Sequence, residues 1–244
     1  MISPLLAKLY GSILEKKLSI WLESEGKWAK GQAVFRRHQS TIDHLVTLRI
    51  IAEECRNDKS NLFCCFVDFR KPFDTVPRYN LWNRLEELKV PLELRAAAIR
   101  LYENVTAKLK SNGGWSKDIK CDIRVKQGCP LSPTLFGIYI DKLEGSLEEA
   151  RCDGTILAGI IVILLLYGDD IVLLARCPYD LDKQLRLLKD FCSTMGMIVN
   201  NDKTKVMIIK SKKDTYANFM YDNNNLEEVY SYKYFGIDIH QKLN

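Results

Sequence analysis

Two adjacent carboxylates inside a strongly apolar run constrain this sequence more than any other feature. The segment LLLYGDDIVLLA, residues 164–175, holds Asp169 and Asp170 between two stretches of aliphatic side chains. Short apolar runs bounded by turn residues are typical of buried strands. Because Gly168 favours a tight turn, the sequence predicts a hairpin over 160–174 with both acids at its tip. A membrane span is disfavoured, since each acid would cost roughly 2.5–3.5 kcal/mol near the bilayer centre.

A third carboxylate ends another apolar segment. In FVDFRKPFD, residues 66–74, Asp68 stands at the end of a strand predicted over 62–69. A carboxylate leaving a buried strand is costly unless it is paired or bound to a metal. Together, Asp68, Asp169 and Asp170 therefore predict a shared site for Mg²⁺ or Mn²⁺. Each segment alone also has an ordinary interpretation, a solvated surface turn for the acid pair and a capping or turn residue for Asp68.

The rest of the chain alternates helical patterns with short strands. Helices are predicted over 5–22, 40–55, 81–88, 92–109, 133–150 and 180–194, and strands over 118–125, 206–209, 217–221 and 234–239. Ser40, with Asp43 three residues later, is the expected N-cap of the second helix, and Gly196 is expected to close the last one. Helices mixed with strands that are partly joined by hairpins indicate an α+β fold with helices against an antiparallel sheet. The content of 47% hydrophobic residues and the net charge of +5 are ordinary for a globular protein, and this charge alone identifies no polyanionic partner.

Five segments occur in the order of the successive motifs of reverse transcriptases. They are FVDFRKPFD, QGCPLSPTLF, YGDD, MGMIVNNDKTK and YKYFG. The sequence most closely resembles the enzymes of LINE-like retrotransposons, which lack long terminal repeats, and the resemblance runs from about residue 32 to 238. It implies a reverse transcriptase domain over 1–244 with the right-hand polymerase fold. Fingers and palm would be intermixed in sequence, with an antiparallel palm sheet backed by helices, and the thumb would be absent.

The resemblance also implies roles for individual residues near the reacting groups. Asp68 and Asp169 would be the main metal ligands, with Asp170 beside them. Lys203 would lie near the triphosphate and donate a proton to pyrophosphate. Without the family, Lys203 is a solvated lysine in a loop.

A second group of residues would bind the substrates. Phe73 would lie under the sugar of the incoming nucleotide, where a flat ring leaves no room for a 2′-hydroxyl. Gln127 and Gly128 would touch the nascent base pair and the template. Arg36 and Arg37 would contact the triphosphate or the template. Without the family, Phe73 is simply a core aromatic residue.

The family resemblance predicts an RNA-directed DNA polymerase core. Such a core transfers a nucleotide from a dNTP to the 3′-hydroxyl of a DNA primer on an RNA template, with Mg²⁺ or Mn²⁺ as cofactor. One alternative is a decayed, inactive retroelement fragment that at most binds nucleic acid. Another is an RNA-directed RNA polymerase, which Gly168 suggests and Phe73 opposes. The sequence leaves the compartment and the oligomeric state open, and only the family resemblance suggests the nucleus.

Some positions depart from the family pattern. In QAVFRRHQST, residues 32–41, Val34 and His38 replace two glycines of the family's first motif. Pro72 stands where alanine is usual. Gly168 also stands where alanine is more common, and we expect that exchange to be sterically harmless.

Overall fold

The structure is a computed structural model that describes residues 5–32, 40–103, 106–107, 110–111, 114–117, 119–120, 123–126, 128–210 and 217–242. The chain folds into two compact units, each assembled from separated stretches. The first unit comprises Met1–Lys27 and Lys71–Tyr139, and the second comprises Trp28–Arg70 and Ile140–Asn244. The predictions for Arg36, Arg37 and Gln127 fall outside the described residues.

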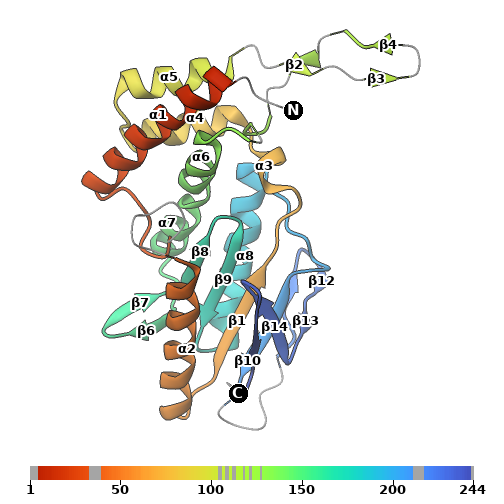
Figure 1. The fold of residues 1–244 in the computed structure, drawn as a ribbon. Helices are drawn as coiled ribbons and strands as arrows, with labels where there is room; N and C mark the ends of the chain where they lie inside the picture. Colours follow the sequence, from red (N-terminus) through yellow and green to blue (C-terminus); the bar gives the residue numbers. More distant parts are fainter. Residues whose placement is uncertain are drawn as a thin grey trace. The chain divides into compact units, whose positions relative to one another are not determined.

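The first unit is mainly helical (Figure 1). Its helices are α1 (Leu5–Ser24), α3 (Pro72–Thr75), α4 (Arg78–Glu87), α5 (Leu92–Tyr102) and α6 (Leu131–Ile140), whose last residue begins the second unit. Its strands form two antiparallel pairs, β2 (Thr106–Ala107) with β5 (Ile119–Lys120) and β3 (Lys110–Ser111) with β4 (Gly114–Trp115).

The helix predicted over 92–109 ends early, at Tyr102. The Tyr102 carbonyl accepts a hydrogen bond from the Arg78 guanidinium at 3.1 Å, and the Leu101 carbonyl accepts one from Lys126 Nζ. Cations that take up the free carbonyls of a last turn stabilise a helix end. Arg78 and Lys126, both distant in the sequence, therefore stabilise the end of α5 at Tyr102, although the apolar pattern of the sequence continues beyond it.

The second unit is built on a five-stranded sheet in the order β13-β10-β1-β9-β8. These strands are β1 (Leu62–Val67), β8 (Leu164–Tyr167), β9 (Asp170–Ala175), β10 (Lys205–Ile209) and β13 (Glu227–Glu228). Neighbouring strands are antiparallel except for β10 and β13, which are parallel. Every residue of the central strand β1 is buried.

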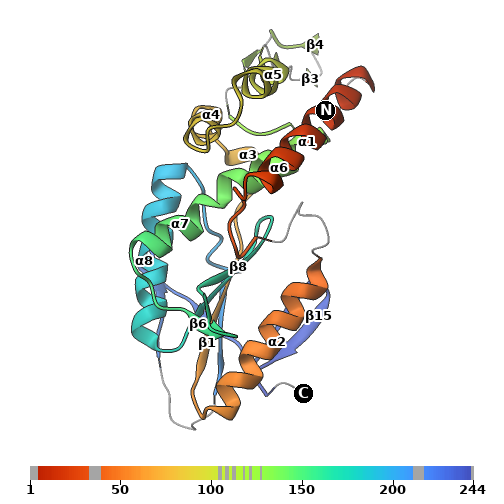
Figure 2. The same cartoon turned by 90° about the vertical axis from the view of Figure 1, so that its left-hand side faces the viewer.

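Helices cover both faces of this sheet. Figure 2 shows α8 (Pro178–Met195) on one side and α2 (Thr41–Asn57) on the other. Cys64 and Phe66 of β1 belong to the core cluster that contains Leu48 and Ile51 of α2. Successive strand side chains point to opposite faces, so a strand covered on both sides must be apolar at every position. This explains the unbroken apolar runs in the sequence.

The ends of α2 and α8 confirm the sequence predictions. Ser40 and Asp43 form a capping box at the start of α2, in which the Ser40 N–H donates to Asp43 Oδ2 at 2.6 Å. Gly196 closes α8 in the left-handed conformation, with φ of 68°.

The helix predicted over 133–150 is two helices, α6 and α7 (Lys142–Glu149), separated at Asp141. The Asp141 carboxylate is buried. It accepts hydrogen bonds from Gln32 Nε2 at 2.7 Å and from the Ala29 N–H at 3.2 Å. Asp141 thus hydrogen-bonds residues 29 and 32, which are distant from it in the sequence, at the point where α6 ends and α7 begins.

Three antiparallel strand pairs complete the second unit. They are β6 (Thr155–Leu157) with β7 (Ile160–Val162), β11 (Met220–Tyr221) with β12 (Asn224–Asn225), and β14 (Ser231–Tyr234) with β15 (Ile237–His240). The hairpin predicted over 160–174 is therefore shorter, because its first strand pairs with β6 instead. The strand predicted over 234–239 is also wrong, since a turn at Phe235 and Gly236 interrupts it.

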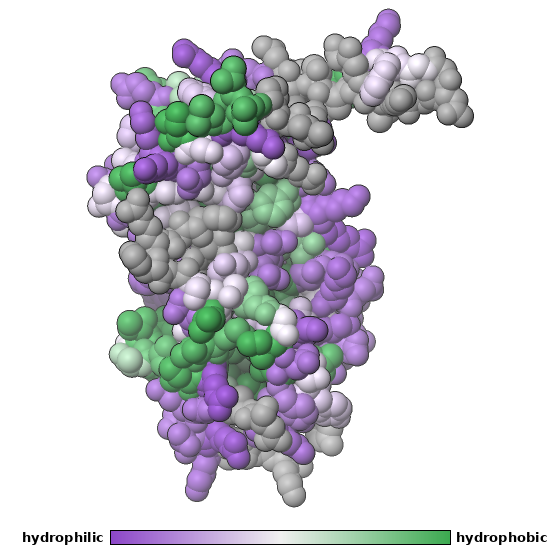
Figure 3. Space-filling model, viewed as in Figure 1, coloured by the Kyte–Doolittle hydropathy of each residue, from purple (hydrophilic) through white to green (hydrophobic). Residues whose placement is uncertain are grey.

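The β6–β7 hairpin exposes Ile156, Ile160 and Ile161, and Figure 3 shows apolar surface in this region and over the neighbouring α2. Within the described ranges, no helix combines the length and the apolar character that crossing a membrane requires.

Candidate active site

The three predicted acids meet at one end of strands β1 and β9. The two strands pair through Val67 and Ile171, so that the next residues, Asp68 and Asp170, are neighbours across the strands. Asp169 lies in the two-residue turn that joins β8 to β9. Strand pairing therefore brings together carboxylates that are far apart in the sequence, as the apolar patterns predicted.

The turn that carries Asp169 depends on a glycine. Gly168 has a φ of 66°, whereas Asp169 is not among the residues with positive φ. A positive φ at the first of two turn residues is typical of a type II′ turn, which favours glycine there. An alanine in this left-handed conformation costs about 1–2 kcal/mol. Glycine therefore adopts the conformation needed at position 168 without strain, whereas alanine there would be strained.

The acids influence one another electrostatically. Asp68 and Asp169 are partly buried, and Asp170 is exposed at the start of β9. Burial, followed by the charge of Asp68, raises the pKa of Asp169. Loss of hydration, followed by the charges of Asp169 and Asp68, raises the pKa of Asp170 to about 6. Such repulsion disfavours three ionised carboxylates and would be relieved by a cation.

Carboxylate oxygens are suitable ligands for a hard divalent cation. In the described part of the chain, no group of three or more His, Cys, Asp and Glu side chains is arranged so that it could hold a metal ion. The site therefore has the oxygen donors and the negative charge that suit a cation, but its carboxylates are not arranged as a complete set of metal ligands.

Asp68 is held on its other side by the segment that follows α8. Asn200 Nδ2 donates to Asp68 Oδ2 at 3.0 Å, and the Asn200 N–H donates to the Asp68 carbonyl at 2.8 Å. The Asp68 N–H donates in turn to Thr204 Oγ1 at 3.2 Å. Lys203 is exposed in the same turn. Sequence reasoning missed Asn200 and Thr204, and their only signal was a position inside MGMIVNNDKTK.

The β14–β15 hairpin packs its aromatic side chains against the strands that carry the acids. The rings of Tyr232 and Phe66 stack with their centroids 4.1 Å apart, and Phe235 meets Tyr167 at 4.9 Å. Burial, followed by the charges of Asp170 and Asp68, raises the pKa of Tyr232. The segment YKYFG, residues 232–236, thus lies in a hairpin beside the acids.

Phe73 and Gly128 belong to the first unit. Phe73 lies in α3, is partly buried, and packs against Phe136 with ring centroids 4.6 Å apart. Gly128 is exposed and has a φ of 79°, and a side chain there would meet no atom within 4 Å. The backbone conformation, rather than lack of space, therefore favours glycine at position 128.

A polar network supports the loop that leads to Gly128. Arg78 Nε donates to the Arg124 carbonyl at 3.0 Å, and Ser132 Oγ donates to the Lys126 carbonyl at 2.6 Å. Ser132 is itself hydrogen-bonded to the Tyr102 hydroxyl at 2.7 Å. Sequence reasoning missed this network because its members are spread over several elements of the first unit.

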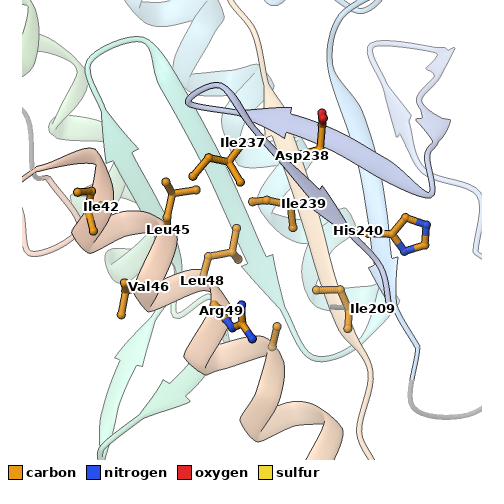
Figure 4. A pocket seen from close by; sticks show the side chains of 11 residues that line it. Ile42, Leu45, Val46, Leu48, Arg49, Ile209, Ile237, Asp238, Ile239 and His240 are labelled. Carbon is orange, nitrogen blue, oxygen red and sulfur yellow. The ribbon is translucent and has the colours of Figure 1, made fainter. Parts of the chain in front are cut away.

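A cavity of about 470 Å³ opens between α2 and the β14–β15 hairpin. Figure 4 shows that it is lined mainly by aliphatic side chains, among them Leu45 and Leu48 of α2 and Ile237 and Ile239 of β15. None of the three acids lines it. This cavity is therefore separate from the candidate active site.

A largely antiparallel sheet that is covered by helices and gathers acids at one end of its central strands is the palm arrangement of α+β polymerases. The chain belongs to the family described as "Reverse transcriptase (RNA-dependent DNA polymerase)", whose model matches residues 2–239.

Curated relatives come from retrotransposable elements of the kind without long terminal repeats. The Pol polyprotein of the type-1 element R2 of Nasonia vitripennis is 27% identical over 205 residues, which cover 78% of this chain and 19% of that protein. A type-2 element of Drosophila melanogaster encodes a Pol polyprotein 25% identical over 195 residues, or 80% of this chain and 18% of that protein. The chain thus spans about a fifth of the length of these relatives.

Solved structures share the fold. Telomerase from Candida tropicalis, in complex with a fragment of telomeric RNA, aligns with a TM-score of 0.66 and 16% identity over 98% of this chain and 37% of that chain. Telomerase from Candida albicans, also with an RNA fragment, aligns with a TM-score of 0.62 and 15% identity over 98% and 38%. At this identity the likeness concerns the fold alone.

Proposed function

We propose that this chain is the core of an RNA-directed DNA polymerase. The observation that supports this most is the convergence of Asp68, Asp169 and Asp170 at one end of the sheet, where partial loss of hydration and mutual charge raise the pKa of Asp169 and Asp170. The reverse transcriptase family generally uses divalent metal, so membership of this family supports metal binding by the three converging acids.

Asp68 and Asp169 would hold two Mg²⁺ or Mn²⁺ ions, with Asp170 beside them. When bound, the ions would activate the primer 3′-hydroxyl and stabilise the leaving pyrophosphate. The protein's contribution is a stiff floor, because β1 and β9 are paired inside the sheet and buried on both faces. Lys203 would supply a proton to pyrophosphate.

An RNA template, a DNA primer and dNTPs are the proposed partners. Membership of a family described as RNA-dependent DNA polymerases supports an RNA template here. In this scheme the second unit is the palm and the first unit contributes the fingers. Phe73 selects the sugar, and the remaining substrate contacts are Gln127, Gly128, Arg36 and Arg37.

Primer extension on poly(rA)·oligo(dT) with Mg²⁺ or Mn²⁺ tests the proposal. We expect incorporation of dTTP that is lost in Asp169→Asn and retained in Asp190→Asn, a matched exchange at an exposed acid of α8. Absence of incorporation with either metal, together with retained RNA binding, would support the inactive fragment instead. Incorporation of UTP in preference to dTTP would support an RNA polymerase.

Phe73→Ala tests the sugar-selecting role in the same assay. Removing the ring should raise the use of UTP relative to dTTP, because space for a 2′-hydroxyl is created. An unchanged ratio of the two substrates would remove the role of Phe73 while leaving the polymerase assignment in place.

A further inference from the structure

We infer that Asn200 and Thr204 form a clamp that positions Asp68, and that both are positioning residues for the proposed metal site. The inference rests on the proposed function, since it concerns how one of its ligands is oriented. Three hydrogen bonds carry it, two at the Asp68 backbone and one at the Asp68 carboxylate.

The clamp arises from an irregularity beside β1. Phe66 pairs with Lys205, and Phe69, which lies three residues further along the chain, pairs with Val199. On the partner strand, however, Val199 lies six residues before Lys205. The second strand therefore carries three extra residues in this interval, which form a turn. The Asn200 carbonyl closes the turn by accepting the N–H groups of Lys203 at 3.1 Å and Thr204 at 2.9 Å. Extra residues that interrupt a ladder often occur next to active sites, where they redirect side chains.

The turn holds the Asp68 backbone from both directions. The Asp68 carbonyl accepts the Asn200 N–H, and the Asp68 N–H donates to the Thr204 hydroxyl. Thr204 is fully buried and immediately precedes β10, which is paired with β1. Asn200 follows Val199, which pairs with Phe69, and Thr204 precedes Lys205, which pairs with Phe66. Because paired residues flank both partners, they restrict where Asp68 can place its side chain.

The carboxylate is oriented by a neutral donor. Asn200 Nδ2 donates to Oδ2, and within the described residues no hydrogen bond or ion pair to Oδ1 is present. An amide leaves the negative charge of Asp68 intact, whereas a lysine or arginine would compete with a cation for it. A further carboxylate would add to the repulsion among the acids. An asparagine is therefore well suited to orient one oxygen of the Asp68 carboxylate while the other oxygen is left for a metal.

Mn²⁺ binding, followed by electron paramagnetic resonance in the absence of nucleic acid, tests the clamp directly. Partners that orient a metal ligand typically contribute 10–100-fold to affinity. We expect Asn200→Leu to weaken Mn²⁺ binding by about 10-fold or more. Asn201→Leu, the same exchange at the next residue, should bind like the wild type. Thr204→Val should also weaken binding, and Thr204→Ser, which keeps the hydroxyl, should restore it.

Two further measurements separate positioning from folding and from chemistry. Thermal unfolding in EDTA should show that Asn200→Leu is folded at the assay temperature. At saturating Mn²⁺, primer extension by Asn200→Leu should recover, whereas Asp68→Asn should stay inactive. Equal Mn²⁺ affinity in Asn200→Leu and wild type would overturn the clamp and leave the proposed function standing. Wild-type protein without Asp68-dependent Mn²⁺ binding would overturn the metal site, and the clamp with it.

Discussion

Two successive hairpins of the second unit have similar sequences and different surroundings. β6–β7 and β8–β9 both consist largely of aliphatic strands joined by two-residue turns. Ile160 and Ile161 of β7 are 60% and 59% exposed, whereas Val172 and Leu173 of β9 are fully buried. β9 pairs with β1 inside the large sheet, while β6 and β7 form a separate two-stranded sheet. Position in the sheet, rather than composition, therefore decides burial.

The turns of the two hairpins also differ. Ala158 and Gly159 both have positive φ, 50° and 82°, which is typical of a type I′ turn. In the other hairpin Gly168 comes first and Asp169 second, which suits type II′. The order of glycine and its neighbour thus selects the turn, and only one of the two turns presents a carboxylate beside Asp68.

The largest effect should come from placing a charge in each hairpin. Val172→Asp buries a carboxylate without a partner and should cost more than about 4 kcal/mol of the free energy of unfolding. Ile161→Asp, on the exposed hairpin, should change it by less than about 1 kcal/mol. Urea unfolding followed by circular dichroism measures both. Similar losses for the two variants would show that β6–β7 is as important to the core as β8–β9.

The pH dependence of stability should report on His44, which lines a cavity together with Ile160 and Leu165 and packs its ring against Tyr167. Burial lowers the pKa of His44 to about 4, despite the opposing charge of Asp43. Below its ordinary pKa of 6.5 the unfolded chain binds the proton more tightly than the folded protein. Stability is therefore fully present above pH 6.5 and is lost as the pH falls towards 4, by up to about 3 kcal/mol.

His44→Phe keeps an aromatic ring against Tyr167 and removes the titration. Urea unfolding of both proteins between pH 4 and 7.5 should show a shallower decline for the variant. Parallel pH profiles would mean that carboxylates alone cause the decline and that His44 is not buried as a neutral ring.

A moderate effect should follow from adding a methyl group at either turn glycine. Gly168→Ala and Gly159→Ala each place an L-residue at positive φ and should each cost about 1–2 kcal/mol. The two variants should differ in primer extension, since only position 168 adjoins Asp169. Thermal unfolding and nucleotide incorporation, measured side by side, test this. Equal nucleotide incorporation by the two variants would show that the geometry of the β8–β9 turn does not affect the candidate active site.

The smallest effect should be a gain at Ala158. This residue has a φ of 50° at the first position of the type I′ turn, where asparagine is favoured. Ala158→Asn should stabilise the protein by about 0.5–1 kcal/mol. A higher midpoint of thermal unfolding with unchanged primer extension is the expected result. A loss of stability would contradict the turn assignment.

Local patterns in the sequence were sufficient for a large part of this structure. The apolar run with its acid pair predicted the β8–β9 turn, and the capping pair Ser40 and Asp43 predicted the start of α2. The end of α8 followed from Gly196. Each of these features depends on residues within a few positions of one another, so that the sequence itself contains the physical cause.

The sequence by itself thus determined the β8–β9 turn, the caps of α2 and α8 and the apolar segments that carry the three acids, because apolar periodicity and backbone preference act over short distances. Tertiary structure alone decided that β9 pairs with β1, that α5 ends at Tyr102, and that Asn200 holds Asp68. These outcomes depend on which distant segments meet when the sheet forms. Pairing energies between remote strands leave no signature in the spacing of neighbouring residues.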